Sequence, residues 1–133
     1  MTDHIAELKK RFLEGDIFPG SMGVELVELK EGEATVAMEV RRDMTNFHGT
    51  VHGGAVFTLA DTAFALACNS HGIPAVALSV TIDYFAPAQP GARLTATAVE
   101  IQKTKRTGNY HITVASGDGR RIAFVRGVAF FRV

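Results

Sequence analysis

The sequence predicts an α+β fold in which a curved antiparallel β-sheet wraps around one long central α-helix. Residues 53–71 lack proline and carry alanine, leucine and phenylalanine at helical spacing, which indicates a single long helix. Two β-type runs precede this helix and four follow it, all separated by turn-forming segments, and such connections favour antiparallel pairing. Because the helix is apolar nearly all round, a flat sheet on one side would leave it uncovered, so we expect the sheet to curve.

The segments before the long helix predict a short helix and a hairpin. Residues 2–14 are charged but place apolar residues on one helical face, and Gly15 then marks a C-terminal stop. Residues 24–41 contain two β-type runs separated by the turn-forming segment 30–33. The second run alternates along its length, the pattern of a half-buried strand. We therefore expect a hairpin here, followed by a loop over residues 42–52.

The β-type runs after the helix predict the rest of the sheet. The helix should end before the Gly-Ile-Pro segment at 72–74, since glycine and proline do not continue a helix. The separators between the later runs contain residues typical of turns. Several runs are apolar on both faces, and one helix cannot cover both, so we expect burial against a second subunit. The predicted strands cover residues 75–87, 92–104, 109–117 and 120–132.

The composition predicts one compact domain over residues 1–133. Fourteen basic and fourteen acidic residues give a formal net charge of zero, which argues against nucleic-acid or membrane-surface binding because both need a basic excess. The longest apolar stretch, residues 54–68, is too short and too polar to span a bilayer. The single cysteine, Cys68, and a charged N-terminal segment without a secretory pattern predict a cytoplasmic protein.

Two glycines open the long helix. Gly53 and Gly54 would leave backbone N–H groups unpaired and unshielded by any side chain. Such a helix N-terminus favours an oxygen that carries negative charge, through its donors and the helix dipole. A thioester carbonyl develops that charge when it becomes tetrahedral during hydrolysis. The alternative is that the two glycines only permit a tight turn and close packing.

Asp61 is an acid placed inside this apolar helix. An ionised carboxylate is costly to bury unless it is paired, and charged groups in apolar settings are enriched at functional sites. As a general base Asp61 would activate water, and as a nucleophile it would form a mixed anhydride. The sequence leaves both routes open. The alternative is a structural carboxylate satisfied by Thr62 or by an arginine on a strand.

The spacing of these features predicts a site shared between two chains. Gly53 and Asp61 are eight residues apart, or about 12 Å along a helix axis. One carbonyl group cannot contact both on the same helix. If both serve one substrate, they come from two antiparallel helices related by a two-fold axis. The site would then lie at a dimer interface and occur twice per dimer.

The run N-F-H-G-T-V-H-G-G at 46–54, followed by A-D-T-A-F-A-L-A-C-N at 60–69, resembles the PaaI-like thioesterases of the phenylacetate pathway. These belong to the 4-hydroxybenzoyl-CoA thioesterase superfamily, whose members have the hotdog fold. The likeness covers most of the chain from about residue 40 onward, and the HGG motif with an aspartate eight residues past its first glycine is its most specific part. It continues through V-T-I-D-Y-F (80–85), L-T-A-T-A (94–98), K-R-T-G-N-Y (105–110) and F-V-R-G (124–127).

The resemblance implies a role for each residue of the motif. The N–H of Gly53 would polarise the thioester carbonyl, and Asp61 of the neighbouring subunit would activate water or attack. Asn46 would help to position the carbonyl or the water, and His52 would shape the site or hydrogen-bond within it. Related proteins place a hydroxyl near the catalytic carboxylate, on the strand after the helix, and Ser79 is the best match in this chain.

Further residues are candidates for substrate binding. Lys105 and Arg106 precede one predicted turn and Arg120 follows another, so these cations could meet the phosphates of coenzyme A. The alternative for each of them is a solvated hairpin end. Gly54, beside the oxyanion glycine, and Thr62, a weaker hydroxyl candidate near Asp61, complete the predicted set.

No metal or redox cofactor is expected. His48 and His52 share a short segment, but no cysteine or acid accompanies them at metal-ligand spacing. Cys68 lies on the apolar helix and is expected to be a buried packing residue instead of a nucleophile.

The resemblance predicts an acyl-CoA thioesterase that acts on an aromatic acyl group, such as phenylacetyl or a hydroxylated relative, and that assembles as a homotetramer of two dimers. Two other classes stay open at this point. A hydratase or dehydratase of the same fold would change acyl unsaturation without releasing thiol. A non-catalytic acyl-CoA-binding protein would bind the ester tightly without turnover, although known regulators of this fold carry a DNA-binding segment for which this chain has no room.

Overall fold

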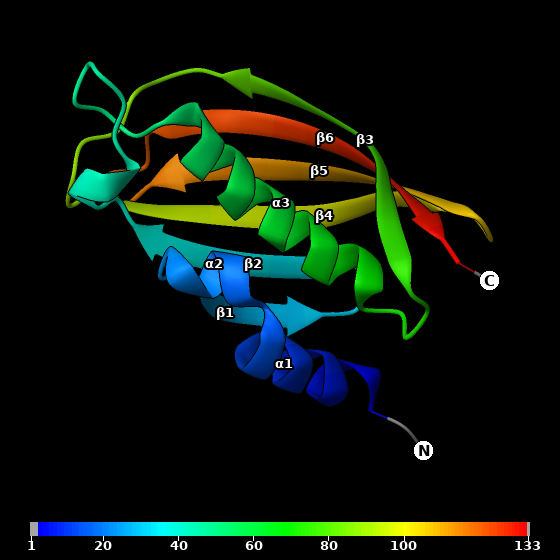
Figure 1. Cartoon of the computed structure of the whole chain (residues 1–133). Helices are drawn as coiled ribbons and strands as arrows, with labels where there is room; N and C mark the ends of the chain where they lie inside the picture. The colour runs from blue at the N-terminus through cyan, green and yellow to red at the C-terminus, as the bar shows by residue number, and fades with distance from the viewer. Residues whose placement is uncertain (1–2, 133) are drawn as a thin grey trace.

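The computed structural model describes residues 3–132. One six-stranded antiparallel sheet curls around a 17-residue helix, α3 (Gly53–Asn69), as Figure 1 shows. The predicted α+β hotdog architecture is confirmed. The remaining elements, in chain order, are α1 (His4–Gly15), α2 (Ile17–Ser21), β1 (Glu25–Lys30), β2 (Glu33–Glu39), the 3-10 turn η1 (Arg42–Met44), β3 (Ala75–Tyr84), β4 (Arg93–Lys103), β5 (Thr107–Ser116) and β6 (Arg121–Phe131).

The sheet has the strand order β1-β2-β4-β5-β6-β3. Three hairpins follow the sequence as predicted, but β3 pairs with β6 at the sheet edge and not with β4, which follows it in the chain. The turn predicted around residues 87–91 is therefore part of a crossover. Its backbone bonds to other segments instead of folding back: Val51 N–H donates to the Ala88 carbonyl, and Gly91 N–H donates to the Val40 carbonyl, each at 2.8 Å.

Several element boundaries differ from the sequence prediction by one to three residues, and the largest difference is the end of β3, at Tyr84 instead of 87. The short helix α2 was not predicted, and α3 ends at Asn69, two residues earlier than expected. Strand β5 begins at Thr107 instead of 109, because the hydroxyl of Thr104 accepts hydrogen bonds from the N–H groups of Arg106 and Thr107 at 3.3 and 3.0 Å and closes the turn early. Residue 2, the predicted start of the first helix, lies outside the described residues.

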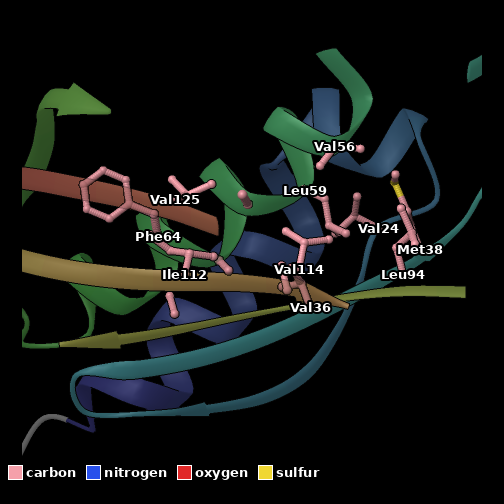
Figure 2. Close-up of a cluster of buried hydrophobic side chains, with 14 of the residues drawn as sticks. Val24, Val36, Met38, Val56, Leu59, Phe64, Leu94, Ile112, Val114 and Val125 are labelled. Carbon is pink, nitrogen blue, oxygen red and sulfur yellow. The ribbon is translucent and has the colours of Figure 1, made fainter. Parts of the chain in front are cut away.

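The core lies between α3 and the concave face of the sheet. Figure 2 shows Val56, Leu59 and Phe64 of α3 in one buried cluster with sheet residues such as Ile112 and Val114. All five of these side chains are at most 2% exposed, and burial of each contributes about 1.5–3 kcal/mol.

One contact fixes α3 against the sheet in a specific position. A Cβ atom added to Gly127 on β6 would lie 2.8 Å from the ring of Phe64. The ring therefore occupies space that is available only because residue 127 has no side chain. The ring of Phe64 also packs against Tyr110, with ring centroids 5.5 Å apart.

The side of α3 that faces away from the sheet is not fully buried. Its residues recur at intervals of three or four, which places them on one helical face, the open stripe: Gly54, Thr58, Asp61, Ala65 and Asn69. Figure 1 shows α2 near this helix, while α1 lies beside β1. The open stripe is where a carboxylate could meet substrate or another chain.

A hydrogen-bonded cluster of polar side chains ties the far end of α3 to the sheet. Glu100 on β4 accepts a hydrogen bond from the hydroxyl of Tyr110 at 2.6 Å. His71, just after α3, places one ring nitrogen 2.7 Å from Glu100 and the other 3.0 Å from Glu31 in the β1–β2 turn. Each ring nitrogen of His71 thus lies within hydrogen-bond distance of a carboxylate oxygen.

This cluster predicts an acid-sensitive contribution to stability. Burial alone would raise the pKa of Glu100, but the hydrogen bonds from Tyr110 and His71 outweigh it and hold the pKa below the ordinary glutamate value. An acid with a lowered pKa stabilises the fold above its unfolded-state pKa, and that stabilisation is lost as the pH falls through the folded-state pKa. Glu100→Gln should therefore lower the free energy of unfolding at neutral pH by about 1.5–3 kcal/mol.

The measurement is urea unfolding at a series of pH values from neutral to acidic. The difference between wild type and Glu100→Gln should shrink as the pH falls below the ordinary glutamate range, about 4.3. Glu39→Gln, at the exposed end of β2, should leave the wild-type pH dependence unchanged. A constant difference between wild type and Glu100→Gln across the whole pH range would contradict the assignment.

Candidate active site

The first turn of α3 presents a backbone donor for which the described part of the chain supplies no acceptor. His52 is the N-cap: its Nδ1 accepts the N–H of Gly54 at 2.9 Å, and its carbonyl accepts the N–H of Ala55 at 2.9 Å and of Val56 at 3.3 Å. Within residues 3–132, no acceptor takes the N–H of Gly53. The helix therefore begins at the predicted glycine, with one N–H available for a negative oxygen.

The loop before the helix is organised by Asn46. Its side-chain oxygen accepts the N–H groups of His48 at 2.9 Å and Thr50 at 3.3 Å, and its amide donates to the Thr50 hydroxyl at 3.2 Å. A β-bridge between Thr45 and Val51 closes the loop. In the single chain Asn46 thus shapes the approach to the helix N-terminus, which is compatible with the positioning role predicted for it.

Asp61 lies on the open stripe of α3 and is half-buried. Within the described part of the chain its carboxylate takes part in no hydrogen bond or salt bridge. Burial raises the pKa of Asp61, and the negative charge of Asp16 raises it further. An acid that is partly desolvated and unpaired is typical of functional sites.

The structural alternative for Asp61 does not hold within residues 3–132. The hydroxyl of Thr62 donates to the carbonyl of Thr58 at 2.7 Å, so it bonds the helix backbone, and Thr62 is only 5% exposed. None of the salt bridges in this part of the chain joins an arginine to Asp61.

Ser79 does not meet Asp61 within one chain. On β3, Val80 and Ile82 pack against the core, whereas Ser79 and Thr81 line a hollow on the opposite face of the sheet together with Arg126 of β6. A role for Ser79 beside the carboxylate therefore depends on a second subunit.

The candidate cations lie at opposite ends of the sheet. Lys105 and Arg106 are in the β4–β5 turn, Arg120 is in the β5–β6 turn, and the whole of β5 separates the two turns. In Figure 1 the β5–β6 turn is at the same end of the molecule as the start of α3. All three side chains are exposed. One phosphate group cannot contact both sets within a single chain.

Two hollows lie along the open stripe, one on each side of Asp61. The first, about 420 Å³, is lined by His52, Gly54 and Thr58 at the start of α3. The second, about 510 Å³, is lined by Ala65 and Leu66 and by residues of α1. A group held at Asp61 would therefore have space in both directions along the helix.

The single cysteine is a packing residue, as predicted. Cys68 is 2% exposed, and burial raises the pKa of its thiol to about 12. Within residues 3–132 no three histidine, cysteine, aspartate or glutamate side chains are grouped so that they could hold a metal ion. No helix in this range is long and apolar enough to cross a membrane.

Two residues that lie beside the site were not among the predicted site residues. Asp16, between α1 and α2, acts on Asp61 through its charge. Tyr84, at the end of β3, donates its hydroxyl to the carbonyl of Gly53 at 3.0 Å. Tyr84 lies in the V-T-I-D-Y-F run at 80–85, but no local pattern indicates that either residue contacts α3, because each reaches that helix only through the tertiary fold.

The chain is similar to known thioesterases. Residues 48–123 match the thioesterase superfamily, a range that includes Gly53 and Asp61. The chain is 43% identical to the acyl-coenzyme A thioesterase PaaI of Escherichia coli over 114 residues, which are 86% of this chain and 81% of that protein.

Solved structures agree in fold. The structure of the E. coli PaaI protein from the phenylacetic acid degradation operon superimposes with a TM-score of 0.95 at 38% identity and covers 98% of this chain and 94% of that one. A Streptococcus mutans protein bound to acetyl-CoA matches with a TM-score of 0.79 at 27% identity, over 82% of this chain and 88% of its own.

Proposed function

This chain belongs to the thioesterase superfamily and is an acyl-CoA thioesterase, and we propose that its substrate carries an aromatic acyl group of the phenylacetyl or hydroxyphenylacetyl type. The reaction is hydrolysis of the thioester to a free carboxylic acid and coenzyme A. The observation that carries the proposed chemistry is an unpaired acid, Asp61, on the open face of a helix whose first N–H, that of Gly53, has no acceptor within residues 3–132.

In this proposal Gly53 supplies the oxyanion site. The thioester oxygen accepts the Gly53 N–H, and the positive end of the α3 dipole favours the charge that develops on that oxygen. Gly54 cannot add a second donor from this turn without giving up its bond to His52, because its N–H is already held at 2.9 Å. His52 therefore acts by holding the turn, and Asn46 by shaping the loop that leads to it.

Asp61 supplies the base or the nucleophile. As a base, its carboxylate takes a proton from water, the hydroxide adds to the carbonyl carbon, and the C–S bond breaks as the coenzyme A thiolate leaves and is protonated. As a nucleophile, it displaces the thiolate to give a mixed anhydride that water then hydrolyses. Label found in Asp61 after turnover in ¹⁸O-labelled water would identify the nucleophile route, since attack of water on the aspartyl carbon of the anhydride leaves ¹⁸O in that side chain.

The two groups are proposed to meet across a dimer. Gly53 and Asp61 lie on one continuous helix, so about two turns and 12 Å separate them in a single chain. Two antiparallel copies of α3 would bring Gly53 of one chain to Asp61 of the other, twice per dimer. Such a dimer also brings the partner's strands close, which gives Ser79 a route to the carboxylate. A mixture of one chain defective at Gly53 with one defective at Asp61 should then regain activity.

The surface of the single chain supports association. Strand β3 forms a sheet edge, and three apolar side chains in this region are exposed: Val76 at 47%, Leu78 at 60% and, just after the strand, Phe85 at 53%. An exposed apolar edge strand is costly for an isolated chain and is commonly covered by another copy. We propose a homodimer through this region and a tetramer of two dimers.

Coenzyme A is the proposed partner of the basic turns. Lys105 and Arg106 at one end of the sheet and Arg120 at the other are exposed cations that suit phosphate groups. Their separation means that, if both turns bind coenzyme A, they serve different sites of an assembly. The S. mutans relative bound to acetyl-CoA supports the ligand class. A cytoplasmic location, favoured by the single buried thiol of Cys68, stays our prediction.

A thiol-release assay over a panel of acyl-CoA esters tests the acyl group. Phenylacetyl-CoA and hydroxyphenylacetyl-CoA should have a kcat/KM at least about tenfold above that of acetyl-CoA or hexanoyl-CoA, a difference of about 1.4 kcal/mol in transition-state binding. Release of thiol at equal efficiency from aliphatic esters would rule out the aromatic preference and leave the thioesterase assignment in place.

A further inference from the structure

Tyr84 lies at the last position of β3, next to the first turn of α3. Its backbone is held by the sheet: Tyr84 pairs with Ala123 on β6, and the N–H of Phe85 donates to the carbonyl of Ile122 at 2.8 Å. Ala123 and Ile122 are 0% and 1% exposed. The position of the tyrosine is therefore set by the core of the sheet and not by a mobile loop.

Both the ring and the hydroxyl of Tyr84 contact Gly53. The hydroxyl donates to the Gly53 carbonyl at 3.0 Å. A Cβ atom added to Gly53 would lie 3.2 Å from the ring carbon Cζ and from the hydroxyl oxygen, tighter than an ordinary contact. The ring thus packs against the glycine Cα and leaves little room for a side chain.

The same peptide unit is held at its other end by His52. The N–H of Gly54 donates to His52 Nδ1 at 2.9 Å, so the carbonyl and the N–H of the Gly53–Gly54 peptide each bond a side chain. Two consecutive glycines have more backbone freedom than any other pair, and helix ends fray. The two hydrogen bonds, one from a strand and one from the cap, restrict that freedom at the point where the oxyanion site is proposed.

We propose that Tyr84 is a positioning residue that acts through Gly53, and this inference rests on the proposed function of that glycine. By fixing the Gly53–Gly54 peptide plane, Tyr84 fixes the first turn of α3 and with it the direction of the Gly53 N–H. A donor that is already aligned needs no reorganisation when charge develops on the thioester oxygen. The hydroxyl of Tyr84 is directed at the Gly53 carbonyl, so its effect on the substrate is indirect.

Tyr84→Phe tests this directly, because it keeps the ring and removes only the donor. The kcat should fall roughly tenfold with KM changed less than about twofold, since the loss concerns alignment in the transition state and is smaller than removal of an oxyanion donor. Tyr84→Leu removes the donor and the ring together and should lower kcat further. The matched control is Tyr110→Phe, which removes the hydroxyl of the other tyrosine, bonded to Glu100. It should lower stability and leave kcat unchanged.

Hydrogen exchange at the Gly54 amide gives a second readout that does not depend on turnover. The amide should exchange slowly in wild type and markedly faster in Tyr84→Phe, while Tyr110→Phe should not open this turn selectively. Should wild type release no thiol from any ester, the proposed function fails, and the exchange data still decide the positioning role. An unprotected Gly54 amide in wild type, or a Tyr84→Phe protein with wild-type kcat and exchange, overturns the inference.

Discussion

Replacement of Asp61 by asparagine should lower kcat for acyl-CoA hydrolysis about a hundredfold or more, the scale expected for loss of a general base. The amide keeps the size of the side chain but can neither accept a proton from water nor attack the carbonyl. The measurement is thiol release under saturating ester. Asp83→Asn, an exposed aspartate on β3, is the matched control and should keep wild-type turnover. Full activity in a folded Asp61→Asn protein would remove Asp61 from the mechanism.

The same variant should be more stable than wild type at neutral pH. Burial and the charge of Asp16 raise the pKa of Asp61, so the ionised carboxylate destabilises the fold above its folded-state pKa. That cost disappears as the pH falls below the unfolded-state value, about 3.9. The stability gain of Asp61→Asn should therefore vanish in acid. In wild type, kcat/KM should fall on the acid side with a midpoint above the ordinary aspartate value.

Replacement of Gly53 by proline should lower kcat about a hundredfold to a thousandfold, the effect of removing one oxyanion donor. Proline lacks the N–H but suits the first position of a helix. The backbone before it is already suitable, because His52 has the extended conformation that precedes proline, with φ −68° and ψ 138°. Gly53→Ala keeps the N–H and adds the Cβ that meets Tyr84, so it separates the steric effect from loss of the donor.

Mixing the two inactive variants tests whether the site is shared. A chain with Asp61→Asn still offers Gly53, and a chain with Gly53→Pro still offers Asp61, so each heterodimer would contain one intact site. After equal mixing and subunit exchange, about a quarter of wild-type activity should return, because half the dimers are mixed and one of their two sites is complete. No activity beyond the sum of the separate variants would mean that the two residues do not meet across chains.

The sequence predicted the long helix and its start because their signals are local. Apolar spacing identifies α3, and a histidine followed by two glycines marks its N-terminus. The pairing of β3 with β6 could not be predicted, since no local pattern says which strand lies beside an edge strand. The turn chemistry between residues 87 and 91 predicts a hairpin, but the backbone there bonds to Val40, just after β2, and to Val51 in the loop before α3.

At the site, too, the residues with a local sequence signal were predicted and those that depend on the tertiary fold were not. Gly53, His52 and Asp61 are identified by motif and spacing along one helix. Tyr84 and Asp16 come to that helix from a strand end and from the junction of two short helices, so only the fold reveals them. Ser79 is a predicted site residue whose role the single chain does not test. It lies on the outer face of β3, so it could approach Asp61 only across an interface with a second chain.

The ring of Phe64 in the space left by Gly127 has a consequence for how the enzyme can vary. Because the ring lies against β6 in the space left by Gly127, sliding or rotation of α3 would displace the ring from that space. A slip of one residue would move Asp61 by about 1.5 Å, and misplacements of this size can reduce a rate by about a hundredfold. A larger residue at position 127 should therefore be accommodated only with a smaller one at position 64, so the two positions are expected to vary together.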